Sequence, residues 1–116
     1  MRTAKQQAKL DVMEEEFRAK LIAALTAAAQ DTYSQLFRSE IHNPYPELRG
    51  HTDPTTNRLL EQAQEIIGLR AQLGEWPEES LAAKFVAYCE RFNNLDDPHR
   101  LGVQKHAQAL LNEVEI

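Results

Sequence analysis

Several features of membrane and secreted proteins are missing from this chain of 116 residues. No apolar run approaches the roughly 20 residues that a helix needs to cross a bilayer. Charges at Lys5, Lys9 and Asp11 interrupt the place where a secretory signal would have its apolar core. Cys89 is the single cysteine, so it cannot form an intrachain disulfide, and it fits a reducing compartment. We therefore predict a cytoplasmic protein without a membrane segment.

Positive charge is also scarce. The chain carries 13 Lys and Arg against 18 Asp and Glu, for a net charge of −5, and residues 75–116 alone carry four basic and eight acidic residues. Nucleic-acid binding requires a basic surface that neutralises a run of phosphates. A helix-turn-helix around Gly74 would place Glu78 and Glu79 where its recognition helix should meet bases or phosphates. Nucleic-acid binding is therefore the least favoured of three functional interpretations.

The motifs of metal and catalytic chemistry are missing as well. The four histidines include no pair spaced i,i+4, and neither a His-Glu-x-x-His nor a Cys-x-x-Cys motif occurs. Cys89 shares a helical face with Phe85 and Phe92, which is the spacing of a core residue, and burial makes a thiol a poor nucleophile. We expect no catalytic residue, no metal and no cofactor.

What the chain does contain is a long N-terminal stretch of helix-forming residues. No proline or glycine occurs between residues 3 and 39, so we predict one long helix over about 3–39. Its apolar residues recur every three or four positions, at Leu10, Met13, Phe17, Leu21, Leu25 and Ala28, with Leu36 and Phe37 continuing the stripe. Glu14 and Arg18 stand at the i,i+4 spacing of a helical ion pair. Asp31 is the weak point, because it could cap a second helix that begins there.

An alanine-rich zone covers residues 23–29 of the same stretch. Small side chains allow another helix to approach closely. Gly68, inside the next predicted helix, would allow the same close packing from the other side.

A Pro-rich crossover loop is predicted over about 41–53, because three prolines and one glycine fall within residues 42–54. A loop of this length in a small helical domain needs a reason. It could travel the length of the bundle and make its neighbour parallel, or it could bind a partner. Tyr45 stands between two prolines and Arg49 follows, and both residue types are enriched at binding hot spots.

Three shorter helices are predicted over about 54–116, each opened by a proline. Asp53-Pro54, Pro77 and Asp97-Pro98 provide the start signals, and Gly74 ends the first of the three. No alternation typical of strands occurs. The prediction is a single all-α domain over 1–116: a helical bundle with one long N-terminal helix, a crossover loop and three shorter helices.

Two functional interpretations follow from this architecture. The first is a non-catalytic protein-interaction or regulatory protein that binds a protein partner or itself. Its long helix would overhang the others, and a homodimer would cover the exposed apolar face. The second is an enzyme or ligand-binding module, with a pocket between the crossover loop and the bundle formed by His42, Tyr45, Arg49 and His51. A bend near Asp31 would weaken the argument for a dimer.

Overall fold

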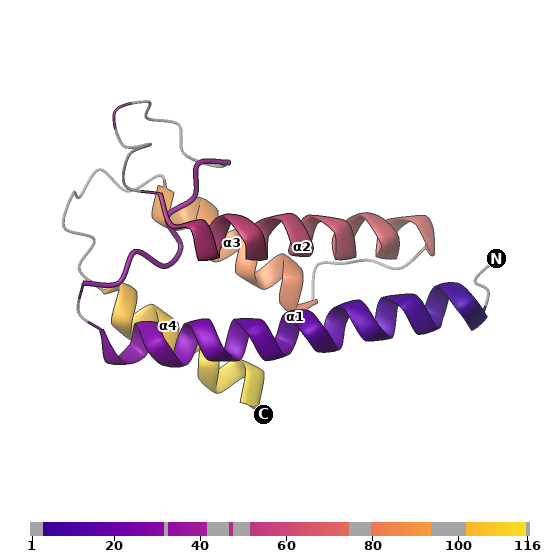
Figure 1. Ribbon diagram of the computed structural model, residues 1–116, viewed down its shortest axis with the longest axis horizontal. Helices are drawn as coiled ribbons and strands as arrows, with labels where there is room; N and C mark the ends of the chain where they lie inside the picture. The colour runs from indigo at the N-terminus through magenta and orange to yellow at the C-terminus, as the bar shows by residue number, and fades with distance from the viewer. Residues whose placement is uncertain are drawn as a thin grey trace.

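The computed structural model describes residues 4–31, 33–41, 47, 52–74, 80–93 and 102–115. This part of the chain forms four helices and no strand: α1 (Ala4–Gln30), α2 (Pro54–Gln72), α3 (Leu81–Asn93) and α4 (Val103–Glu115) (Figure 1). The predicted all-α bundle, with one long helix followed by three shorter ones, is confirmed. None of the helices in the described residues combines the length and the apolar character needed to cross a membrane.

The four helices form two layers. α1 and α2 run antiparallel in one layer, and α3 and α4 cross behind them in the view of Figure 1. α4 runs back along α1, because Gln104 Nε2 donates to the Ala29 carbonyl at 2.7 Å and Arg18 Nη2 donates to the Val114 carbonyl at 3.1 Å. α3 and α4 therefore cover one side of the α1–α2 layer.

The core lies between the layers and contains the apolar stripe of α1. Leu10, Phe17, Leu21, Leu25 and Ala28 are all buried, as their spacing predicts. An aromatic cluster continues the core toward α3 and α4, and it consists of Phe17, Phe37, Phe85, Tyr88, Phe92 and His106.

The prediction that the first helix extends to about Ser39 is wrong, because α1 ends at Gln30. The Asp31 carboxylate accepts the backbone N–H of Tyr33 at 2.9 Å, and such a local bond offers the backbone an alternative to the next helical turn. Phe37 then adopts a left-handed backbone with φ 72°. Leu36 and Phe37 are buried, but they reach the core through a turn and not along a helical stripe.

The irregular connection therefore begins at Asp31, ten residues before the predicted start of the crossover loop, and its first part is bonded to the start of α2. The Asp53 N–H donates to the Arg38 carbonyl at 2.9 Å, and the Ser39 hydroxyl donates to Asn57 Oδ1 at 3.0 Å. Asp53 is the N-cap of α2, as the sequence predicts. Its Oδ1 accepts the Thr55 N–H at 3.2 Å. We call these bonds, together with that from the Phe37 N–H to Thr56 Oγ1, the latch.

The latch excludes one explanation for the length of the crossover. α2 begins beside Arg38 and runs antiparallel to α1, so the connection does not make α2 a parallel neighbour of α1.

The other helix ends agree with the sequence in part. Gly74 follows α2 with φ 77°, as its predicted role at a helix end requires. α3 begins at Leu81, and the Ser80 hydroxyl accepts the Ala83 N–H at 3.2 Å, a cap that the sequence analysis did not identify. Pro77 and Asp97-Pro98 lie outside the described residues.

Candidate functional site

The four residues predicted to form a binding site lie outside the described part of the chain. These residues are His42, Tyr45, Arg49 and His51. The pocket predicted between the crossover loop and the bundle therefore stays a prediction. Of the region around it, the structure describes Ile41, Glu47 and Thr52, and Ile41 is an exposed apolar residue.

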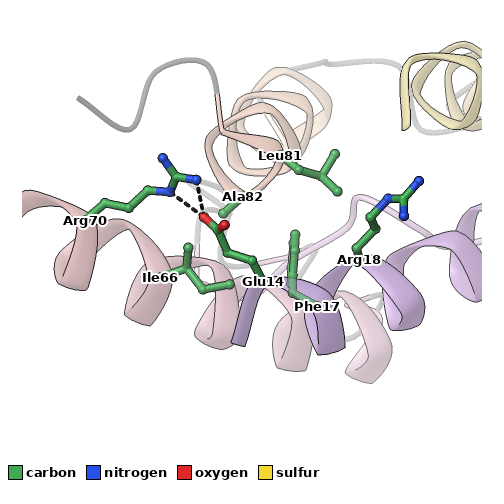
Figure 2. A pocket seen from close by; sticks show the side chains of 7 residues that line it. All are labelled: Glu14, Phe17, Arg18, Ile66, Arg70, Leu81 and Ala82. Carbon is green, nitrogen blue, oxygen red and sulfur yellow. Dashed lines mark hydrogen bonds and ion pairs between the residues drawn. The ribbon is translucent and has the colours of Figure 1, made fainter. Parts of the chain in front are cut away.

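One hollow lies on the inner side of the α1–α2 layer, where the start of α3 meets it. Figure 2 shows its seven lining residues, and its volume is about 150 Å³. Apolar side chains of Phe17, Ile66, Leu81 and Ala82 form most of its wall. A hollow of this size has room for a few water molecules or a very small ligand.

The charged groups of this inner hollow are already paired. Arg70 donates through both Nε and Nη2 to one carboxylate oxygen of Glu14 (Figure 2), although the sequence spacing had predicted Arg18 as the partner of Glu14. Arg18 instead donates to the Val114 carbonyl at the end of α4. Glu14 lines this hollow together with Ala82, which lies in the first turn of α3. The charged groups of the inner hollow therefore connect α1 to α2 and are not free to bind a ligand.

Two larger hollows follow one another along the opposite side of the α1–α2 seam. The first, of about 440 Å³, is lined by Lys20, Ala23, Ala24, Thr55, Arg58, Leu59, Glu61 and Gln62. The second, of about 680 Å³, is lined by Lys9, Met13, Glu65, Gly68, Leu69 and Gln72. Every one of these residues belongs to α1 or α2, whereas α3 contributes to the inner hollow. We call the two hollows together the outer seam.

The two helices contribute opposite net charge to the outer seam. α1 contributes Lys9 and Lys20, and α2 contributes two acids, Glu61 and Glu65, and one base, Arg58. Within the described residues, none of these five side chains has a hydrogen-bond or ion-pair partner. Solvated charges above a partly apolar floor can pair with opposite charges on another molecule while the floor is buried.

The alanine-rich zone is the one sequence signal for this surface, since Ala23 and Ala24 line its first hollow. Ala23 is exposed and Ala28 is buried, so the zone has one face in the core and another toward solvent. The charged residues of the outer seam could not be identified from sequence, because a helical pattern does not tell which side of two helices the other helices will cover.

Cys89 is in the core, as its spacing with Phe85 and Phe92 predicts. Burial raises the pKa of its thiol far above the usual range, and the nearby carboxylates of Asp53 and Glu90 add to the rise. The thiol therefore stays protonated and is a poor nucleophile.

His106 is the one histidine that the structure describes. It is half-buried, with its ring edge-on to Phe92 at 5.0 Å and to Tyr88 at 6.1 Å between centroids. These contacts make it part of the aromatic cluster. In the described stretches of the chain, no three His, Cys, Asp or Glu side chains gather closely enough to share a metal ion.

Comparison with known proteins returns no relative. No protein-family model, no curated protein and no solved structure matches the chain.

Proposed function

We propose that the chain is a small non-catalytic protein-interaction protein that binds its partner through the outer seam. One observation carries the proposal: α3 and α4 pack on one side of the α1–α2 layer, and the other side bears two hollows whose charged side chains have no partner among the described residues. Met13 and Leu69, both half-buried, supply apolar surface there. A surface of apolar floor and charged rim is typical of protein interfaces.

The placement of the reactive groups supports this choice over an enzyme. Cys89 is buried, and Glu14 and Arg70 neutralise each other at a helix joint. We place the activity in a reducing compartment such as the cytoplasm, because the single cysteine is a free, buried thiol. The ligand-pocket interpretation depends on residues outside the described ranges, and no described contact favours it.

The test compares two exposed alanines. Ala23→Arg puts a long charged side chain into the first hollow of the outer seam, and Ala109→Arg makes the same change at an exposed position of α4. We expect proteins captured from native lysate by the intact chain to be lost with Ala23→Arg and kept with Ala109→Arg. Quantitative mass spectrometry of the captured proteins measures the difference. Equal capture by both variants would contradict a binding role for this surface.

A further inference from the structure

We infer that the outer seam binds a second copy of this chain, in a dimer whose two-fold axis runs parallel to α1 and α2. The inference rests on the proposed function, because it uses the same surface, and it adds the identity of the partner. It is argued from the distribution of charge along the seam, from the antiparallel course of the two helices and from the size of the open face.

The charges of the seam become complementary when α1 of one subunit lies over α2 of the other. The α1 wall carries Lys9 and Lys20, and the α2 wall carries Glu61 and Glu65 with one arginine, Arg58, so the two walls have opposite net charge. A partner suited to this surface has a negative wall opposite α1 and a positive wall opposite α2. The chain itself has such a surface, since each wall fits the other.

The antiparallel arrangement fixes which residues meet. Rotation about an axis parallel to the helices lays α1 over α2 of the partner subunit and keeps every residue at its own level along the axis. Lys20 and Glu61 line the same hollow from opposite walls, so they lie at the same level. Lys20 therefore faces Glu61 of the partner subunit, and the symmetric contact repeats this pair.

A different axis gives a less favourable contact. Rotation about an axis across the helices lays α1 on α1 of the partner, which brings lysine walls together and glutamate walls together. Like charges placed opposite each other in an interface oppose binding. Glu16 is exposed one turn before Lys20, but it lines neither hollow of the seam. Lys20 and Glu61 line the same hollow, so this pair is the one that tests the geometry.

The size of the face is sufficient for a specific dimer. α2 has 19 residues and is therefore about 28 Å long, and two adjacent helices are together about 20 Å wide. The molecule measures 46 × 30 × 20 Å, and Figure 1 looks along its shortest axis onto the layer formed by α1 and α2. A stable interface buries about 800 Å² on each partner, which is of the order that such a face provides.

The test exchanges the two charges. Lys20→Glu and Glu61→Lys each place like charges together twice in the dimer, so we expect each variant to raise the dimer dissociation constant by about tenfold or more. The double variant Lys20→Glu/Glu61→Lys restores opposite charges and is expected to dimerise nearly as well as the natural chain. Lys105→Glu, at an exposed position of α4, is the matched control and should leave the constant unchanged. Sedimentation equilibrium against the chain mass of 13.3 kDa measures the natural chain and the four variants.

Several results would overturn the inference. The natural chain sedimenting at one chain mass up to about 100 µM is the first, since its interface would then be weaker than specific dimers require. Single variants that dimerise like the natural chain, or a double variant no better than the singles, would exclude the paired walls. Circular dichroism shows whether the variants fold. If they do not, weakening of the natural dimer by added salt supports charge pairing, and salt-independent dimerisation contradicts it. If the natural chain is a monomer and Ala23→Arg still abolishes its capture of another protein, only the self-association is excluded and the proposed function stands.

Discussion

Phe37 combines complete burial with a backbone conformation that few residues other than glycine adopt. Its φ is 72°, and a side chain in this left-handed region costs about 1–2 kcal/mol. Its N–H donates to Thr56 Oγ1 at 3.1 Å, and its ring stacks on that of Phe92 with centroids 5.0 Å apart. These contacts hold the strained residue in place, so Phe37 sets the path of the chain from α1 to α2.

Replacing Phe37 tests both its packing and its backbone. Phe37→Ala and Phe37→Gly each remove a buried ring, so both should lower the free energy of unfolding by about 3–5 kcal/mol. Because φ is positive, we expect the glycine variant to be more stable than the alanine variant by about 1 kcal/mol. Urea unfolding gives the comparison. Ala27→Gly is the control, because Ala27 is an exposed helical position where glycine should destabilise the protein. If Phe37→Ala proved more stable than Phe37→Gly, the left-handed geometry of residue 37 would be contradicted.

Cys89 makes stability depend on pH in the alkaline range. Burial first, then the charges of Asp53 and Glu90, raise the pKa of its thiol in the folded protein, whereas in the unfolded chain the thiol ionises near about 8.5. The stabilisation is therefore complete below about pH 8.5 and is lost as the pH rises above it, because only the unfolded chain releases the proton.

Denaturant unfolding between pH 7 and pH 10 measures this effect. We expect the free energy of unfolding of the natural chain to fall above about pH 8.5 by up to about 1.4 kcal/mol for each pH unit more than that of Cys89→Ala. The comparison of slopes removes the contributions of lysines and tyrosines, which both proteins share. Parallel slopes would show that the thiol titrates alike in the folded and unfolded chains.

Individual core residues were predictable because they depend on spacing alone. Leu10, Phe17 and Cys89 are buried where the helical period places them. Partners distant in sequence were not predictable in the same way. Glu14 has Arg18 one turn away, but it bonds Arg70, which lies 56 residues further along the chain and comes close only when α1 and α2 pack.

At the scale of the elements, the end of α1 shows the limit of helix propensity. Residues 31–39 include no proline or glycine, so they contain no strong helix breaker. The turn comes from local bonds, in which Asp31 accepts the Tyr33 N–H, and from the anchoring of Phe37 in the core. Tyr33 itself is 87% exposed. Leu36 and Phe37 are buried as predicted, but a turn and not a helix brings them into the core.

The described residues do not show the close packing expected at Gly68. None of their atoms lies within 4 Å of the place where a Cβ on Gly68 would stand, so glycine is not required there for space among them. Gly68→Ala should raise the free energy of unfolding by about 0.5–1 kcal/mol, because alanine restricts the unfolded chain and suits the interior of α2.

Gly74 provides the matched control for this prediction. Its φ of 77° suits glycine, so Gly74→Ala should lower the free energy of unfolding by about 1 kcal/mol. Thermal or urea unfolding of both variants shows whether each substitution raises or lowers the free energy of unfolding. A destabilising Gly68→Ala would contradict the open space beside Gly68 in α2.

At the scale of the whole molecule, the reason to expect a dimer has changed. A helix reaching Ser39 would have overhung its shorter neighbours, but α1 ends at Gln30 and its Leu10 is buried beside α2. The exposed surface of the bundle that invites a partner is the outer side of the α1–α2 layer. The sequence showed which residues of each helix are apolar, but the side that α3 and α4 occupy follows from packing of all four helices.

The latch has a consequence for how this chain can change over time. Arg38 and Asp53 are joined by a hydrogen bond of 2.9 Å, so the segment between them leaves and re-enters the bundle at one point. Doubling the length of a loop whose ends are fixed costs only about 0.6 kcal/mol. Insertions, deletions and new binding sequences between residues 42 and 51 can therefore accumulate with little penalty to the fold, and related chains can acquire different specificities there while keeping one scaffold.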